Sequence, residues 1–226
     1  MFLLRYLAWL VTRAIVSLRY RVKIQGIEQV RGLKGPVLIL PNHPAYMDPT
    51  LVLVALWPSL RPRPLQYEGF FRNPLLYPLM KILGALPVPD LERASVQARE
   101  RTRQTLDTVI EGLKGGQCFV LWPAGHIQYD GSEHLGGTRA AADILQAVPS
   151  AELVLVRTRG LWGSIFSYAP RGKKPRLIRN LWRAIGLLLS NLFVFMPRRS
   201  VSMIVEHVSR DRLPEPKREV DRKSVV

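Results

Sequence analysis

Short apolar segments typical of strands alternate along the chain with segments of helical periodicity. This alternation predicts an α/β fold in which helices flank a mixed, mainly parallel sheet. The length of 226 residues and the hydrophobic content of 47% suit one such domain with a sizeable core. The expected strands are Tyr20–Gln25, Pro36–Leu40, Pro64–Tyr67, Gly84–Val88, Gln117–Trp122, Glu152–Thr158 and Val201–His207.

Two of the connecting helices have clear limits in the sequence. The first is expected over Leu91–Leu113, and Gly115-Gly116 is expected to end it. The second is expected over about Thr138–Ala147 and should end near Pro149. The apolar face of the first helix comprises Leu106, Val109, Ile110 and Leu113.

Residues 36–49 carry a histidine and an aspartate five positions apart, at the point where an apolar strand runs into a turn. Pro41 and Pro44 cannot continue the strand, so Asn42 and His43 are expected to project from its end. Strand ends are where α/β sheets bind ligands. Asp48 followed by a proline predicts a helix start, with Asp48 as the N-cap.

Two interpretations of this pair are open from the residues alone. In the first, His43 is a general base and Asp48 orients it. In the second, Asp48 only caps a helix and His43 is an ordinary turn residue. A His-x4-Asp spacing arises easily by chance, so the rest of the chain has to decide between them.

The net charge of +16 is concentrated in two windows of the sequence. No acidic residue occurs before Glu28 or between Glu152 and Glu206, and these windows hold five and ten basic residues. Each window also contains an apolar helix candidate, residues 1–19 in the first and residues 177–196 in the second.

Both apolar segments are expected to lie on a membrane surface and not to cross it. Arg5 and Arg13 interrupt the first, and the apolar run of the second, Ala184–Met196, is short of the roughly 20 residues that a span needs. Basic residues beside Leu, Phe and Trp suit an anionic membrane surface. The alternative is two core helices with solvated basic flanks. No nucleic-acid partner is expected, because no recognised nucleic-acid motif accompanies the charge.

Other features exclude disulfides and a structural metal. The single cysteine, Cys118, lies in an apolar run and is expected to be a buried residue in a reducing compartment. His126, His134 and His207 lack the close spacing of a zinc site, so no metal is expected. Residues 208–226 are charged and lack hydrophobic periodicity, which predicts a mobile tail.

Four blocks of the sequence resemble the motifs of the glycerophospholipid acyltransferase family, the group of the lysophosphatidate and lysophospholipid acyltransferases. They occur in the family's order and span about residues 20–207. The wording of the fourth block is similar to that of bacterial acyltransferase domains of lysophospholipid type. The blocks are Asn42-His43-Pro-Ala-Tyr-Met-Asp48, Phe71-Arg-Asn-Pro74 through Leu83-Gly-Ala-Leu-Pro-Val88, Val120-Leu-Trp-Pro123-Ala-Gly125, and Leu153-Val-Leu-Val-Arg157-Thr-Arg159-Gly-Leu-Trp162-Gly-Ser164.

The resemblance implies an acyltransferase fold and transfer of a fatty acyl group from an acyl-CoA or acyl-carrier-protein thioester to a hydroxyl of a lysophospholipid. His43 would be the general base and Asp48 its orienting carboxylate. No cofactor and no covalent acyl-enzyme are required, because the thioester is already activated. The implied location is peripheral or monotopic, on the cytoplasmic face of a membrane, the bacterial inner membrane. Candidate substrate-binding residues are Asn42, Arg72, Pro123, Gly125, His126, Arg157 and Arg159.

The chain departs from the family pattern at positions that the family uses to bind the acceptor's phosphate. Ala124 replaces the usual glutamate of the third motif, His126 a threonine and Ile127 an arginine, while Asp90 lies near the place of an arginine that follows the second motif. Three explanations are open. Arg93 or Arg139 supplies the charge, the acceptor carries a head group in place of a bare phosphate, or activity is lost and only lipid binding remains. We favour an active enzyme with altered acceptor choice, because His43, Asp48, Pro123 and Gly125 are all present.

A group of apolar residues in and just before the second block has two interpretations. These residues line a tunnel for the acyl chain, or they fill the core. They are Phe70, Phe71, Leu75, Leu76 and Met80.

Overall fold

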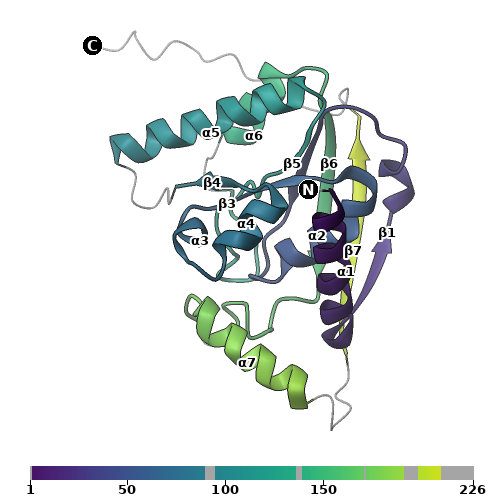
Figure 1. Cartoon of the computed structure of the whole chain (residues 1–226), viewed down its shortest axis with the longest axis vertical. Helices are drawn as coiled ribbons and strands as arrows, with labels where there is room; N and C mark the ends of the chain where they lie inside the picture. Colours follow the sequence, from purple (N-terminus) through teal and green to yellow (C-terminus); the bar gives the residue numbers. More distant parts are fainter. Residues whose placement is uncertain (1, 90–94, 136–138, 171, 191–197, 210–226) are drawn as a thin grey trace.

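The computed structural model describes residues 2–89, 95–135, 139–170, 172–190 and 198–209. Within these ranges the chain forms one seven-stranded sheet in the order β1-β7-β6-β2-β5-β3-β4 (Figure 1). β7 pairs antiparallel with β6, and the other neighbours pair parallel, which confirms the mixed, mainly parallel sheet. The strands are β1 Tyr20–Gln25, β2 Val37–Pro41, β3 Arg63–Tyr67, β4 Leu86–Val88, β5 Cys118–Val120, β6 Glu152–Arg159 and β7 Arg199–Val208.

Three strands differ in length from the sequence prediction by two residues or more. The strand expected from Gly84 begins only at Leu86, because Gly84 adopts a left-handed conformation, φ 63°, that ends a helix. β5 covers only the middle of the expected Gln117–Trp122. β7 continues through Val208, the residue at which the charged tail was expected to begin, and residues 210–226 lie outside the described residues.

The helices keep the order that the sequence indicated. α5 begins after Ser95, whose Oγ accepts a hydrogen bond from the Ala98 amide at 3.1 Å, and the expected positions 91–94 lie outside the described residues. α6 begins at Ala140, and the expected first position, 138, lies outside the described residues. The helices are α1 Phe2–Arg19, η1 Ile27–Val30, α2 Asp48–Leu60, α3 Gly69–Arg72, α4 Tyr77–Leu83, α5 Val96–Lys114, α6 Ala140–Ala147 and α7 Leu177–Ser190.

Two hydrophobic cores lie on opposite faces of the sheet. The first core lies between the sheet and α1, α2 and α7, and Val154 and Val156 of β6 point into it. The second core lies between the sheet and α5 and α6, and Leu38 of β2 and Phe119 of β5 are fully buried in it. Figure 1 shows α5 and α6 together at one end of the molecule, and α7 at the other end.

α1 packs one face on α2 and exposes apolar residues on the rest of its surface. The rings of Phe2, Tyr6 and Trp9 surround Trp57 of α2, and Trp9 Nε1 donates a hydrogen bond to the Val54 carbonyl at 2.9 Å. None of the helices in the described ranges is long and apolar enough to cross a membrane. The exposed residues include Leu3, Leu7, Leu10, Val11, Ile15 and Leu18.

Gly26 gives a direct test of how β1 is joined to β7. This residue adopts φ 77° between β1 and η1, and a Cβ atom added there would overlap the carbonyl oxygen of Val205 in β7. We expect Gly26→Ala to lower the free energy of unfolding by on the order of 2 kcal/mol or more, as measured by urea denaturation. Gly32→Ala is the matched control, since a Cβ there meets no atom within 4 Å. Equal stabilities of the two variants would contradict this packing.

Candidate active site

His43 and Asp48 form a close pair beyond the end of β2. His43 Nδ1 lies 3.0 Å from both carboxylate oxygens of Asp48. The Asp48 side chain is fully buried, and the His43 side chain is 14% exposed. Because an ionised carboxylate only accepts hydrogen bonds, Nδ1 carries the proton and donates it. Nε2 is then the basic nitrogen of the imidazole.

The end of β2 is fixed to β6 by the side chain of Asn42. Asn42 Oδ1 accepts a hydrogen bond from the Thr158 amide at 2.7 Å, and Asn42 Nδ2 donates to the Thr158 carbonyl at 3.0 Å. The Asn42 amide also donates to the Val156 carbonyl at 3.1 Å. Asn42, predicted to bind substrate, therefore positions the residue that follows it.

The structure corrects the role predicted for Asp48 in the helix. α2 begins at Asp48 itself, Met47 holds the N-cap position, and no side-chain capping bond is formed within the described residues. The carboxylate is turned to the imidazole instead, so of the two roles that the sequence offered it takes the pairing with His43.

Glu133 and Gln128 hold the backbone of His43, and sequence reasoning missed both. The His43 amide donates to both carboxylate oxygens of Glu133, each at 3.2 Å, and its carbonyl accepts from the Gln128 amide at 2.8 Å. Gln128 Nε2 donates to Glu133 at 2.6 Å, which joins the two supports. Both residues lie in a polar loop without periodicity, so no sequence pattern distinguished them.

Burial controls the electrostatics of the pair. Burial raises the pKa of Asp48 most, the charge and hydrogen bond of His43 lower it, and the negative charge of Glu133 raises it, so that the pKa is about 6. The Trp122 ring, buried in the first core, lies with its centroid 5.7 Å from that of the imidazole. The pair thus lies in an environment of low polarity, where a charge that forms on His43 is stabilised mainly by Asp48.

The third sequence block forms a turn packed on the protein interior. Ala124 and Ile127, at the positions of the family's glutamate and arginine, are each 4% exposed. Gly125 adopts φ 69° and is exposed, and it follows the half-buried Pro123. His126 is half-buried, its ring centroid lies 5.9 Å from that of Tyr129, and its Nδ1 lies 3.3 Å from the Ile127 carbonyl. The turn therefore presents no charged side chain at those two positions.

Arg157 and Arg159 lie on the other face of the sheet from the imidazole. They are exposed and alternate along β6 with the buried Val156 and Thr158. Asn42 and Pro44 line a cleft of about 300 Å³ with the two arginines. The side chain of His43, the residue between Asn42 and Pro44 in the chain, contacts Trp122 and α2 instead. The other lining residues are Gln128, Gly131, Glu133, Thr158, Gly160 and Trp162.

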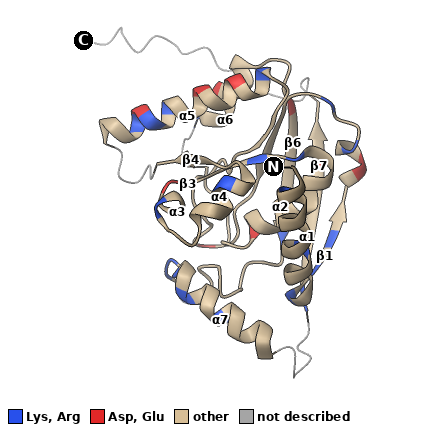
Figure 2. Ribbon diagram, in the orientation of Figure 1, with Lys and Arg blue, Asp and Glu red and all other residues tan. Residues whose placement is uncertain are grey.

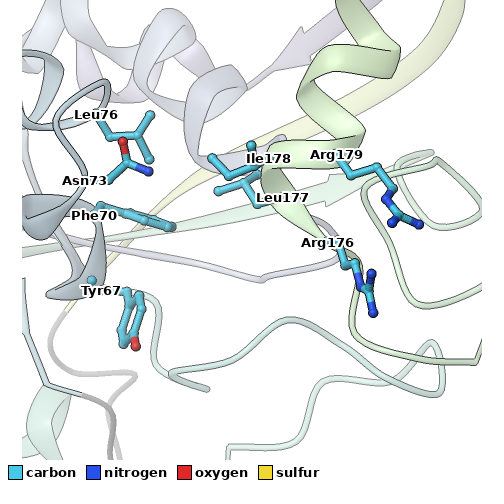
Figure 3. A pocket seen from close by; sticks show the side chains of 9 residues that line it. Tyr67, Phe70, Asn73, Leu76, Arg176, Leu177, Ile178 and Arg179 are labelled. Carbon is cyan, nitrogen blue, oxygen red and sulfur yellow. The ribbon is translucent and has the colours of Figure 1, made fainter.

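A second cavity, of about 410 Å³, lies between α3 and α7 (Figure 3). Phe70 and Leu76 line it, whereas Met80 belongs to the core and Leu75 is 75% exposed. Figure 3 shows Phe70 and Leu76 facing Leu177 and Ile178 of α7 across this cavity. Tyr67, Gly69, Asn73, Arg176 and Arg179 complete the lining.

The remaining candidates lie apart from the pair. Arg72 is 71% exposed and pairs with Glu68 at 3.3 Å. Arg139 is 65% exposed with its Nε 4.0 Å from Asp143, and Arg93 and Asp90 lie outside the described residues. Cys118 is half-buried, and burial raises the pKa of its thiol. Within the described ranges no three His, Cys, Asp or Glu residues are grouped so that they could hold a metal ion.

Comparisons with known proteins agree with the sequence blocks and with the fold. The family model described as Acyltransferase matches residues 21–156, more than half of the chain. The crystal structure of the 1-acyl-sn-glycerophosphate (LPA) acyltransferase PlsC from Thermotoga maritima is similar in fold, with a TM-score of 0.58 and 15% identity. The match covers 89% of this chain and 66% of that one, so this chain spans just under two thirds of PlsC. A comparison with curated proteins found no match.

The buried Asp48 carboxylate should reduce stability at neutral pH. Its pKa of about 6 in the folded protein exceeds the unfolded value of about 3.9, so ionisation costs folding free energy as the pH rises from about 4 through 6. Asp48→Asn removes this cost. We expect its unfolding free energy, relative to wild type, to be higher at pH 8 than at pH 4.5 by about 2 kcal/mol in urea denaturation.

The control for this comparison is Asp107→Asn, which changes an exposed carboxylate of α5. Its difference from wild type should be the same at both pH values. If the unfolding free energy of Asp48→Asn relative to wild type is independent of pH, or falls as the pH rises, then ionisation of Asp48 does not reduce the stability of the folded protein.

Proposed function

The chain belongs to the Acyltransferase family, and from this we propose that it transfers a fatty acyl group from a thioester to a hydroxyl of a lysophospholipid or related lipid at a membrane surface. The observation that carries the proposal is the His43–Asp48 contact beyond the end of β2. It holds an imidazole with Nδ1 engaged and Nε2 as the base, which is the group that a hydroxyl acceptor needs. The family's match includes this segment.

The proposed reaction is a direct transfer with His43 as general base. Nε2 takes the proton of the acceptor hydroxyl while the oxygen attacks the thioester carbonyl, which forms the new C–O bond. The C–S bond then breaks, and the leaving thiolate recovers the proton from the imidazolium. General base catalysis of this kind contributes roughly 10² to 10⁴ in rate.

Asp48 has two roles in this proposal. Its hydrogen bond keeps the proton on Nδ1, and its negative charge stabilises the imidazolium that forms during the attack. Glu133 and Gln128 act through the His43 backbone, whose amide and carbonyl they bind, and so are positioning residues. Cys118, near the start of β5 with its Sγ 3.8 Å from the Gly35 carbonyl, has no part in the transfer.

Two amphipathic helices support the proposed membrane contact. α1 and α7 both pack against the first core, on the same face of the sheet as Asp48. α7 exposes an apolar stripe next to basic residues, and each base near an anionic surface contributes on the order of 1 kcal/mol. Figure 2 shows Lys and Arg on both helices. The stripe consists of Ile178, Leu181, Trp182, Ile185 and Leu189, and the bases are Arg176, Arg179 and Arg183.

The cavity between α3 and α7 suits the lipid acceptor. Its Phe70, Leu76, Leu177 and Ile178 side chains suit an acyl chain, and Arg176 and Arg179 supply positive charge at the start of α7. These arginines come from a helix proposed to touch the bilayer, so a lipid can enter the cavity from the membrane. We therefore propose a peripheral or monotopic position on the cytoplasmic face of a membrane, where acyl thioesters occur.

A second candidate is a lipid-binding module without transferase activity. The observation that favours it is the burial of Ala124 and Ile127 where the family has charged residues. It predicts vesicle binding without transfer, whereas the first proposal requires both.

Replacement of His43 tests the proposed base. We expect His43→Ala to reduce the rate of acyl transfer to a lysophospholipid by roughly 10² to 10⁴, and to lower the thermal stability, because it leaves the buried Asp48 carboxylate without its partner. The rate is measured with a labelled acyl thioester and separation of the lipid products. His134→Ala, which changes an exposed histidine, should keep wild-type activity. Unchanged transfer by His43→Ala would disprove the assignment.

Replacement of exposed residues in α7 tests the membrane contact. We expect Trp182→Ser combined with Leu189→Ser, which removes two side chains that are 66% and 57% exposed, to weaken sedimentation with anionic vesicles at least tenfold. Val96→Ser on α5, where the side chain is 83% exposed, is the control and should bind as wild type does. Equal vesicle binding by all three proteins would show that α7 does not contact the membrane.

A further inference from the structure

One face of the sheet is left uncovered over β1, β7 and β6. α5 and α6 cover the neighbouring strands β2, β5 and β3 through the second core, but most residues of β1, β7 and β6 on that side are exposed, apart from Leu153 and Val208. The alternate residues of β6 and β7 are buried in the first core. We call this surface the uncovered face, and it consists of Arg21, Lys23, Gln25, Leu155, Arg157, Arg159, Ser200, Ser202, Ile204 and Glu206.

The strand register brings the bases of the uncovered face together. Lys23 of β1 is paired with Ser202 of β7, and Ser202 is paired with Arg159 of β6. Adjacent strands lie about 4.8 Å apart, so Lys23 and Arg159 lie about 10 Å from each other across one strand. Arg21, paired with Ser200, and Arg157, paired with Ile204, lie on either side of the row that contains Lys23, Ser202 and Arg159.

The charge of this face is not balanced within the part of the chain that the structure describes. Four bases stand against one acid, Glu206, and no ion pair involves any of the four bases among the described residues. Ser and Gln side chains fill most of the remaining surface, and the two aliphatic residues are 39% and 37% exposed. A polar, basic, flat surface of this kind attracts an acidic protein surface.

The uncovered face leads to the catalytic strand end. Arg157 and Arg159 belong both to it and to the cleft of about 300 Å³ that Asn42 and Pro44 line. Arg199 fixes the far wall of that cleft, because its guanidinium donates to the carbonyls of Gly160 and Trp162, each at 2.6 Å. A group bound in the cleft therefore lies next to the backbone of His43, beyond the ends of the strands.

A membrane and a second copy of the chain are less suitable occupants of this surface. The apolar stripes of α1 and α7 lie on the first-core side of the sheet, so a bilayer that contacts them does not reach the opposite face. A second copy would bring two sets of like charges together, which disfavours association.

We propose that the uncovered face binds an acidic carrier protein that delivers the acyl group as a thioester on a flexible, phosphate-bearing arm. The acidic surface of the carrier contacts Arg21 and Lys23, and the phosphate of the arm binds Arg157 and Arg159 in the cleft. The thioester reaches His43 around the strand ends, the C–S bond breaks, and the thiol leaves with the carrier. This inference rests on the proposed acyl transfer.

The test compares two donors and measures carrier binding separately. The variant is Arg21→Glu with Lys23→Glu, and the matched control is Arg99→Glu with Arg103→Glu, the same charge change at two exposed positions of α5. Transfer to one lysophospholipid is measured with an acyl carrier protein thioester and with acyl-CoA. Binding of the carrier protein in its phosphopantetheine form is measured by fluorescence anisotropy at low and high salt.

We expect the β1 variant to raise the KM for the carrier thioester and the carrier Kd roughly tenfold at low salt, with a smaller effect at high salt. The KM for acyl-CoA and the vesicle binding of the β1 variant should change less than twofold. The KM for the carrier thioester and the carrier Kd of the α5 control should also change less than twofold. Arg157→Ser with Arg159→Ser should raise the KM for both donors, because both carry a phosphate on the thioester arm.

Several outcomes would overturn the inference. These are an unchanged carrier Kd in the β1 variant, an equal rise in KM for both donors, or a loss of vesicle binding, which would make the face a membrane contact. If wild-type protein binds the carrier and the β1 variant does not, but neither donor supports transfer, the surface is confirmed and the proposed transferase function is wrong.

Discussion

The contact between His43 and the fully buried carboxylate of Asp48 determines what the rest of the structure has to supply. A carboxylate at this depth is costly, and its pKa of about 6 records that cost. The chain keeps the contact by fixing the position of His43. Asn42 binds the end of β2 to β6, and Glu133 and Gln128 hold the His43 backbone. An imidazole fixed in this way needs little reorganisation when charge forms on it.

The two proposed substrates are assigned to opposite faces of the sheet. On the first-core side, α1 and α7 expose apolar stripes, and the cavity between α3 and α7 suits a lipid. On the other side, the uncovered face is polar and basic and leads to the cleft beside residues 42–44. The lipid and the acyl donor can then approach the imidazole from different directions, which leaves both able to exchange without displacing each other.

Much of this arrangement could be predicted from local sequence. The strands were visible as short apolar runs, and prolines 41 and 44 placed His43 at a strand end. The carboxylate partner followed from the same segment. The predicted N-cap role of Asp48 was wrong. The carboxylate pairs with the imidazole of His43, and this tertiary contact outweighs a capping bond at the start of α2.

Other parts depend on contacts between distant segments and could not be found in this way. Asn42 pairs with Thr158, 116 positions away, and Glu133 reaches His43 from a loop without periodicity. The uncovered face cannot be recognised until the register of β1, β7 and β6 is known, although the excess of bases in those parts of the sequence was clear.

The measurement that tests the central claim most directly is the single-turnover rate of acyl transfer between pH 5 and 9. The account predicts that the rate falls as the pH is lowered through about 6, because the Asp48 carboxylate then takes up a proton and no longer stabilises the imidazolium. A rate that stays constant through pH 6 would contradict it.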